Sequence, residues 1–224
     1  MNYEIVKSKK LLLDFIDWLP ELEDHEIFYL ALFARKKYAP DLKYSKTDKT
    51  QLKRFTSTKD KLFHKIKQLE CELGSYYLKG MEAPQESLAL YITVNPRSQT
   101  NASRNMLIKL AHLVGEPYNG HNLHQIALSE IQKAKSYTRY VDFDIDSKEE
   151  SLEDIKLKLI DIVGSDCWKI LETRGGYHIL VNPNNSNNKF WYNKIKSAFV
   201  CDVVGDNMIP VIGCTQGNFI PKFV

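Results

Sequence analysis

The sequence predicts an α+β protein in two parts. A mainly helical, basic region is expected over residues 1–86, and an α+β domain over residues 87–224, with its core at about 137–224. Three observations lead to this division. Apolar residues recur at helical spacing near the N-terminus. Runs of β-branched and aromatic residues begin at Leu88. The last third has strand and helix patterns in the order β-α-β-β-α-β, which is typical of the ferredoxin-like or RRM-like sheet.

Three helices are expected before residue 86. Each has an apolar stripe at helical spacing, and Pro20 ends the first of them. A strand of apolar and β-branched residues and two further helices follow, and residues 115–125 are expected to form a loop. The expected helices span 10–18, 26–38, 57–69, 104–113 and 128–135, and the strand spans 88–94.

The C-terminal elements carry the β-α-β-β-α-β order. In that arrangement the first and third strands are central neighbours, so residues 142–146 should lie beside His178. Gly175-Gly176 indicates a tight turn between the second and third strands. The expected elements are strands 137–146, 168–173, 177–181, 200–204 and 208–212, helices 152–163 and 190–199, and an Asn-rich loop at 182–188.

Composition excludes several classes of protein. The chain has 224 residues, of which 43% are hydrophobic and 26% charged, so an intrinsically disordered chain is excluded. Asp14 and Asp17 interrupt the most apolar early stretch, and no signal peptide is recognised, so we expect a cytoplasmic protein that does not enter a membrane. The four cysteines include no CxxC pair, so no structural zinc is expected.

Positive charge is concentrated in one segment. Between residues 35 and 68 there are 12 Lys or Arg and three acidic residues, a local balance of +9 in a chain whose net charge is +3. Such asymmetry indicates a basic surface for a polyanion, although a solvated helical face is the simpler interpretation. The candidate nucleic-acid-binding residues in this segment are Lys46, Lys49, Lys53 and Arg54.

Three carboxylates follow one another on the first strand of the C-terminal core. Side chains alternate along a strand, so Asp142, Asp144 and Asp146 should share one face. Like charges this close destabilise a sheet unless a cation compensates them, and Mg²⁺ or Mn²⁺ prefers oxygen ligands. The sequence therefore predicts a divalent-metal site here, and the alternative is an acidic face exposed to solvent.

A histidine is expected on the neighbouring strand. On strand parity Arg174, Gly176 and His178 share a face, which would present a cation, a site of close approach and an imidazole to a triphosphate. The alternative is a hydrogen-bonded histidine of the core. These three residues and Arg97 are the candidate nucleotide-binding residues.

Three segments in this order resemble the motifs of the archaeo-eukaryotic primase superfamily, which includes primases and primase-polymerases. Its first motif, two Asp residues one position apart at the end of an apolar strand, resembles residues 141–146. Its second, an Arg-Gly-rich turn leading to a histidine on a strand, resembles residues 174–178. Its third, an acid after an apolar run and then an apolar Pro/Gly-containing strand, resembles 200–202 followed by 209–213. The resemblance covers about residues 137–224.

The resemblance implies a catalytic palm that binds two Mg²⁺ or Mn²⁺ ions. The Phe-Asp-Ile-Asp form favours Asp144 and Asp146 as the metal pair, and Asp142 with Asp144 fits nearly as well. Asp202 matches the third acid best, with Asp206 as the reserve. The residues implied to be catalytic are Asp144, Asp146, Asp202 and His178. The zinc module of many family members is missing from this sequence.

The implied function is a DNA primase or primase-polymerase, a nucleotidyltransferase that copies a single-stranded DNA template with nucleoside triphosphates. The sequence has no G-x-x-x-x-G-K-[ST] motif, so a replicative role would require a separate helicase. Two alternatives remain open. The first is an RNA-binding module of the same topology, although its aromatic signature is not matched. The second is a metal-dependent nuclease or replication initiator that uses the same carboxylates.

Overall fold

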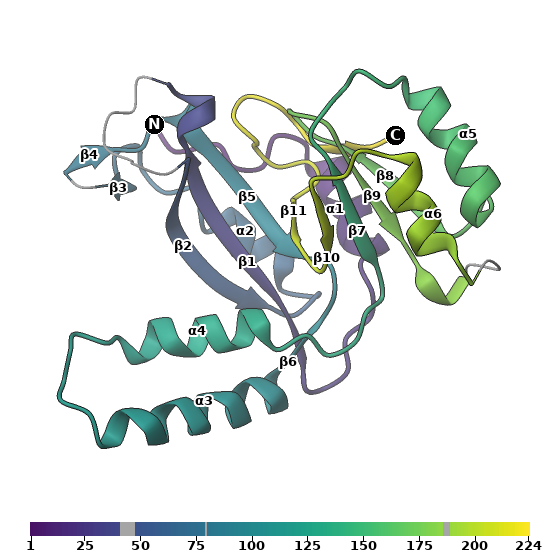
Figure 1. Ribbon diagram of the computed structural model, residues 1–224. Coiled ribbons are helices and arrows are strands. Elements are labelled where there is room, and N and C mark those ends of the chain that lie inside the picture. Colours follow the sequence, from purple (N-terminus) through teal and green to yellow (C-terminus); the bar gives the residue numbers. More distant parts are fainter. Residues whose placement is uncertain (41–47, 79, 186–188) are drawn as a thin grey trace.

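The computed structural model describes residues 1–40, 48–78, 80–185 and 189–224. Within these residues the chain forms two five-stranded antiparallel sheets and six α-helices, which together make an α+β protein (Figure 1). The smaller elements are a β3–β4 hairpin (Tyr77–Leu78 and Met81–Glu82) and the 3₁₀ turns η1, η2 and η3 (Lys36–Tyr38, Gln85–Ser87 and Pro183–Asn185). None of the helices in the described parts of the chain is long and apolar enough to cross a membrane.

The first sheet is built from strands on both sides of residue 86. Its order is β11-β5-β1-β2, and β6 pairs with the start of β1. The strands are β1 (Glu26–Arg35), β2 (Lys49–Ser57), β5 (Leu88–Thr93), β6 (Arg97–Ser98) and β11 (Met208–Pro210). Strands from both sides of the expected domain boundary between residues 86 and 87, such as β1 and β5, therefore pair within one sheet.

The helix expected at 26–38 is wrong, and so is the expectation of a mainly helical N-terminal region. This segment forms β1 and η1, with β2 as its antiparallel partner. The helical stripe used for the prediction left Phe28, Tyr29 and Leu32 unexplained, yet none of the three exposes any of its surface. A strand covered on both faces has a continuous apolar sequence and no alternation, so its periodicity resembles that of a buried helix.

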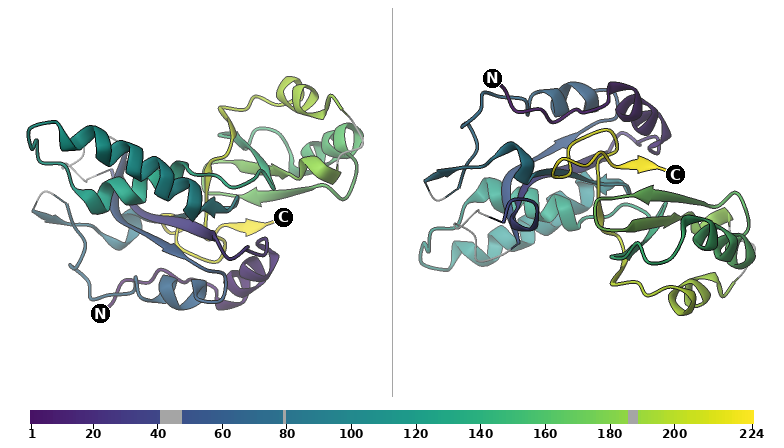
Figure 2. Two further views of the ribbon diagram at one scale, coloured as in Figure 1. Left: turned by 90° about the horizontal axis from the view of Figure 1, so that it is seen from below. Right: turned by 90° about the horizontal axis from the view of Figure 1, so that it is seen from above.

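Helices cover both faces of the first sheet (Figure 2). On one face lie α1 (Lys9–Trp18), where a helix was predicted, and α2 (Leu62–Lys67), which begins later than predicted because Ser57 ends β2. On the other face lies a hairpin of α3 (Gln99–Val114) and α4 (Leu123–Lys133). The apolar contacts of α4 with this face involve Leu128, Ile131, Tyr29 and Ala31.

The second sheet has the strand order β10-β7-β9-β8-β12. The predicted order β-α-β-β-α-β is present, and its first and third strands, β7 and β9, are neighbours as expected. The C-terminal strand β12 adds to the edge at β8. The elements are β7 (Val141–Ile145), α5 (Leu152–Val163), β8 (Trp168–Glu172), β9 (Tyr177–Val181), α6 (Trp191–Ala198), β10 (Val203–Gly205) and β12 (Lys222–Phe223).

The two faces of the second sheet have different chemistry. One face packs Phe143, Ile145 and Ile179 against α5 and α6. The opposite face, which we term the inner face, carries Asp142, Asp144 and His178 at one place, and Leu171 and Leu180 in the apolar core that includes α1 and the first sheet. The two sheets thus share one core, and the polar part of the inner face lies beside it.

The chain crosses from the second sheet to the first between β10 and β11. The side chain of Asp206, at this crossing, accepts a hydrogen bond of 2.8 Å from Asn95 Nδ2 and pairs with the guanidinium of Arg97. Asn95 is fully buried, and it also binds the backbone of Tyr140, which precedes β7. This buried polar network fixes the two sheets relative to each other at their adjoining edges.

Candidate functional site

A polar cavity of about 90 Å³ lies where the two sheets meet. Its walls carry opposite charge. Cationic side chains come from the first sheet and from η1, and acidic side chains come from β7 and the residue that follows it. The charged residues and the histidine that line it are Arg35, Lys37, Lys49, Asp144, Asp146 and His178.

The acidic wall is built by the alternation of side chains along β7. Asp144 lies directly opposite His178 in the register of β7 and β9, as the predicted topology requires. Asp144 and Asp146 line the cavity, whereas Asp142 is 1% exposed and lies deeper on the inner face. The expected grouping of the carboxylates beside the histidine is therefore present.

His178 sits between two carboxylates. Its Nδ1 lies 2.9 and 3.1 Å from the two carboxylate oxygens of Asp142, and its Nε2 lies 3.5 Å from Asp144 Oδ1. Burial opposes charge on this imidazole, but the nearby carboxylates, Asp142 foremost, outweigh burial and hold the pKa of His178 above its ordinary value. The histidine is therefore both a buried, hydrogen-bonded residue and a group whose second nitrogen faces Asp144.

Asp144 lies in an environment that disfavours a charged carboxylate. Burial raises its pKa, and the neighbouring Asp142 and Asp146 raise it further, while His178 and Lys49 act in the opposite direction. A carboxylate with raised pKa beside two others is the arrangement that a bound cation would relieve.

Two residues of the cationic wall, Arg35 and Lys37, were not among the predicted site residues. Arg35, at the end of β1, is 5% exposed, and its Nε donates a 2.7 Å hydrogen bond to Asp48 Oδ2 while its Nη1 bonds the hydroxyl of Tyr91. Lys37 donates its backbone N–H to the same Asp48 carboxylate at 2.8 Å. The charge excess that begins at Arg35 pointed to this region, but a helix was predicted there rather than a strand.

Lys49, at the start of β2, completes the wall. Burial lowers its pKa, the neighbouring Arg35 and Lys37 lower it further, and the carboxylates of Asp144 and Asp48 oppose them. Lys49 thus interacts electrostatically with both sides of the cavity. It was predicted to contact nucleic acid, and the structure places it beside the carboxylates.

The turn before β9 uses its residues differently from the strand parity that was assumed, because β9 begins only at Tyr177. Arg174 is exposed, and its guanidinium lies 4.6 Å from the ring centre of Tyr38 and donates a 2.6 Å hydrogen bond to the carbonyl of Gly217. It stands near the cavity without lining it. At Gly176 an added Cβ would lie 1.8 Å from the carbonyl oxygen of Ile145, so a glycine here permits the close pairing of this turn with the end of β7.

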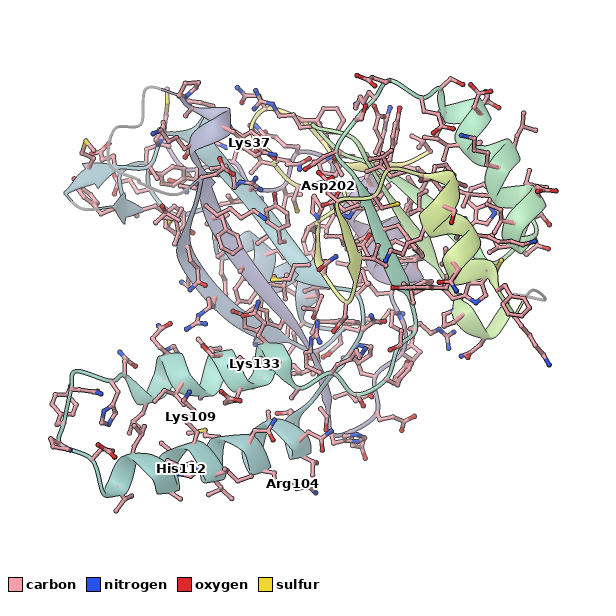
Figure 3. All side chains as sticks on the ribbon, viewed as in Figure 1. Lys37, Arg104, Lys109, His112, Lys133 and Asp202 are labelled. Atoms are coloured by element: carbon pink, nitrogen blue, oxygen red, sulfur yellow. The ribbon has the colours of Figure 1, made fainter. Side chains whose placement is uncertain are left out.

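The candidate third acids lie in two different environments. Asp202 is exposed, its backbone N–H donates a 2.9 Å bond to the carbonyl of Asp144, and it lines a second cavity of about 240 Å³ with Asp146 and Glu150. Asp146 borders both cavities. Asp206 is paired with Arg97 at the crossing between the sheets, and neither residue lines the first cavity. Figure 3 shows Lys37 and Asp202 on the two sides of the region where the sheets meet.

The three predicted nucleic-acid-binding residues that the structure describes lie in different environments. Lys46 lies outside the described residues. Lys49 lines the cavity and Lys53 is exposed on β2. Arg54 turns toward α4, where it donates hydrogen bonds to Ser129 Oγ at 2.9 Å and to the carbonyl of Gln125 at 3.0 Å.

No group of three or more His, Cys, Asp or Glu side chains is placed to hold a metal ion in the parts of the chain that the structure describes. The four cysteines are free thiols. Asp144 and Asp146 nevertheless share the cavity, and Mg²⁺ is commonly held by one or two carboxylates together with substrate phosphates. The donor set therefore fits a metal ion that arrives with a phosphorylated substrate.

No family model, no curated protein and no solved structure matched the chain in the three comparisons. A functional conclusion must therefore come from the site itself.

Proposed function

We propose that this protein is a template-dependent nucleotidyltransferase, a DNA primase or primase-polymerase. The observation that carries the proposal is the cavity in which the carboxylates of Asp144 and Asp146 face Arg35, Lys37 and Lys49. A metal-bound triphosphate is complementary to such a site. Its cation would bind the carboxylates of the acidic wall, and its phosphates would bind the side chains of the cationic wall.

The arrangement of the second sheet supports this function. Its four strands β10-β7-β9-β8 correspond to the fourth, first, third and second strands of a ferredoxin-like or RRM-like palm. The site residues lie on the two central strands, and the cationic wall is contributed by a separate sheet. A simple RNA-binding module of this topology would present its sheet to RNA, whereas here the inner face is partly covered by the shared core.

The metal pair proposed is Asp144 and Asp146. Asp142 is the weaker candidate because both of its carboxylate oxygens lie within 3.1 Å of His178 Nδ1 and it does not line the cavity. Bound divalent ions would supply activation of the attacking 3′-hydroxyl and charge stabilisation of the leaving pyrophosphate. Asp202 stands beside Asp146 at the second cavity, where it could contribute to that end of the site.

The remaining residues would bind and orient the nucleotide. Arg35 is fixed by Asp48 and Tyr91, so its guanidinium is preorganised at the cavity. Asp142 orients the imidazole of His178 and leaves Nε2 toward Asp144 and the cavity. Arg174 lies against the ring of Tyr38, which lines the cavity, and the exposed Lys53 on β2 would contact a single-stranded DNA template without sequence preference.

The direct test is primer synthesis and extension. The protein is incubated with single-stranded DNA, labelled ribo- or deoxynucleoside triphosphates, and Mg²⁺ or Mn²⁺, and products are resolved by length. We expect metal-dependent products longer than the nucleotides supplied. Shortening of the DNA would instead indicate the nuclease alternative. If the protein binds RNA but forms no extension product with either Mg²⁺ or Mn²⁺, the RNA-binding alternative would be indicated. Because the chain lacks a helicase motif, duplex DNA without a single-stranded region should not be copied.

A further inference from the structure

Two tyrosines line the cavity between the sheets, beside its cations. Tyr38 belongs to η1 and Tyr91 to β5, and their rings form a small apolar cluster with Ala89. Both tyrosines are buried. Burial raises the pKa of Tyr38 above its ordinary value, and the neighbouring Tyr91 raises it further, so this phenol stays neutral. Tyr38 therefore adds an aromatic ring to the wall without adding a charge.

In the described parts of the chain, each Lys or Arg side chain that lines the cavity lies close to one of these rings. Arg35 Cζ is 5.3 Å from the ring centre of Tyr38 and 5.9 Å from that of Tyr91. Lys37 Nζ is 5.7 Å from the ring centre of Tyr38, and Lys49 Nζ is 5.6 Å from that of Tyr91. A cation within about 6 Å of a ring centre is attracted by the negative face of the ring.

The rings offset a repulsion between these cations. Burial lowers the pKa of Lys49, and the positive charges of Arg35 and Lys37 lower it further, so the three cations disfavour one another. A carboxylate could compensate them, as Asp48 does for Arg35, but its negative charge would also repel a phosphate. An aromatic ring holds a cation in place and leaves the positive charge available to an anion.

The two tyrosines are themselves fixed by their neighbours. Gly217 lies so close to Tyr38 that an added Cβ would be 2.4 Å from Tyr38 Cγ. The carbonyl of Gly217 accepts the hydrogen bond from Arg174, whose guanidinium lies against the same tyrosine ring. The hydroxyl of Tyr91 accepts a hydrogen bond from Arg35 Nη1. Both rings are therefore rigid parts of the cationic wall.

We infer that Tyr38 and Tyr91 are positioning residues, whose rings hold the cations of this cavity in place for the phosphates of a metal-bound triphosphate. The inference rests on the proposed function, because that function supplies the triphosphate. The ring of Tyr38 is the part that acts on the cations, so Phe should replace this tyrosine and Leu should not. The alternative is that both tyrosines are core residues that contribute only to stability.

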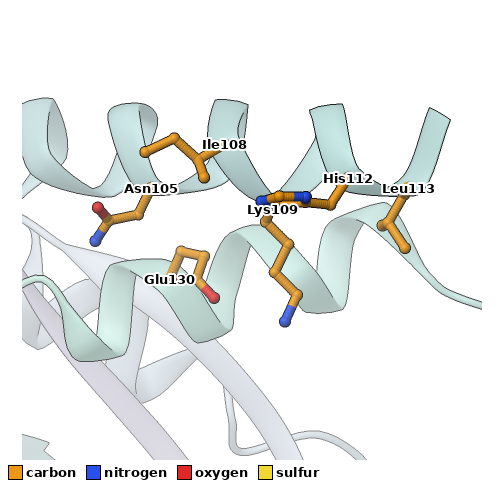
Figure 4. Close-up of a pocket in the computed structure, with 6 residues that line it drawn as sticks. All are labelled: Asn105, Ile108, Lys109, His112, Leu113 and Glu130. Atoms are coloured by element: carbon orange, nitrogen blue, oxygen red, sulfur yellow. The ribbon is translucent and has the colours of Figure 1, made fainter. Parts of the chain in front are cut away.

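Another groove of the molecule supplies a control cation. The groove between α3 and α4 has a volume of about 420 Å³, and no tyrosine is among the residues that line it (Figure 4). Lys109 lines this groove together with Glu130 and apolar side chains. Replacing Lys109 by Met removes one positive charge from the protein without changing the cavity between the sheets.

The test measures the binding of inorganic tripolyphosphate to the full chain, in the presence of Mg²⁺, by isothermal titration calorimetry. We expect Tyr38→Leu to weaken binding about tenfold and Tyr38→Phe to bind within about twofold of the wild type. Tyr38→Leu should have a smaller effect when Lys37→Met is already present, because the ring acts through the cation. Tyr91→Leu and Tyr91→Phe test the second ring in the same way, and the Leu variant should bind more weakly.

Two controls are expected to bind tripolyphosphate as the wild type does. Lys109→Met tests for a general effect of lost positive charge. Tyr76→Leu tests for a general effect of a lost buried ring, because Tyr76 is 8% exposed and lies outside the lining of the cavity. All titrations are made at a temperature at which circular dichroism shows each variant to be folded.

The outcomes separate this inference from the proposed function. Equal dissociation constants for the Phe and Leu variants at both tyrosines would overturn the inference and leave the proposed function standing. Additive effects of Tyr38→Leu and Lys37→Met, or equal effects of Tyr38→Leu and Tyr76→Leu, would do the same. If the wild type does not bind tripolyphosphate, or if Lys109→Met weakens binding as much as Lys37→Met, the cavity is not a polyphosphate site and both proposals fail.

Discussion

The two walls of the cavity come from strands of different kinds. The strand in the acidic wall can be recognised from its sequence pattern, whereas the strand in the cationic wall cannot. The acidic wall lies on β7, where apolar and acidic residues alternate because one face packs on helices and the other faces the cavity. The cationic wall lies at the ends of β1 and β2, and β1 is buried on both faces. Alternation reveals a strand that has two different environments, and a strand with helices on both sides does not show it.

This difference explains how much of the site could be predicted. The carboxylates, the histidine and their proximity followed from strand parity and from the β-α-β-β-α-β order, since β7 and β9 pair as that topology requires. The contribution of Arg35 and Lys37 did not follow, because it depends on the docking of a second sheet that is distant in sequence. The close approach of Gly176 to the backbone of Ile145 could not be predicted either, because it is set by the pairing of this turn with the end of β7.

The same limit applies to individual charges. Asp206, the reserve third acid, and Arg97, a candidate nucleotide-binding residue, are paired with each other at the crossing between the sheets. Arg54, a candidate nucleic-acid-binding residue, is bonded to α4. Sequence shows that a charge is present in a segment, but its partner is fixed by the tertiary fold.

The largest expected effect separates two carboxylates on β7. Asp144→Asn should lower nucleotide incorporation at least about a hundredfold while leaving the fold intact, because it removes a proposed metal ligand and a like-charge repulsion. Asp142→Asn should instead destabilise the protein by about 3–5 kcal/mol, since it removes the buried negative charge that is paired with His178. The two are distinguished by steady-state incorporation and urea unfolding on the same preparations. Full activity in Asp144→Asn would remove the acidic wall from the proposed mechanism.

A second comparison concerns the two glycines that follow Arg174. Gly176→Ala places a methyl group 1.8 Å from the carbonyl oxygen of Ile145, so β7 and the turn before β9 must separate. We expect a loss of about 1–3 kcal/mol in the free energy of unfolding, and lower activity because the carboxylates move relative to His178. Gly175→Ala is the control, because its Cβ would meet only Asp146 Oδ1, at an ordinary 3.6 Å. Equal unfolding midpoints for the two variants would contradict the close pairing described here.

The cationic wall is tested on β2 with two lysines of the same strand. Lys49→Met should raise the KM for nucleotide about tenfold, because Lys49 lines the cavity opposite Asp144. Lys53→Met should leave that KM unchanged and reduce the salt dependence of DNA binding, because Lys53 is exposed on the strand away from the cavity. Steady-state kinetics and DNA titrations at several salt concentrations measure both. A shift of nucleotide KM in Lys53→Met alone would reverse the assignment of the two lysines.

The smallest expected effect concerns Arg54, a predicted DNA contact whose side chain links β2 to α4. Arg54→Met should leave the salt dependence of DNA binding as it is in the wild type, because its guanidinium is engaged by Ser129 and by the backbone of Gln125. Loss of these bonds should lower the local stability of the hairpin of α3 and α4 by about 1–2 kcal/mol. The stability of the two sheets should change only slightly. Hydrogen exchange read by mass spectrometry should therefore show faster exchange in the hairpin with little change in β7 and β9. If DNA binding weakens and the hairpin exchanges at the wild-type rate, Arg54 belongs to the template surface after all, and the basic segment acts as a unit as its sequence first indicated.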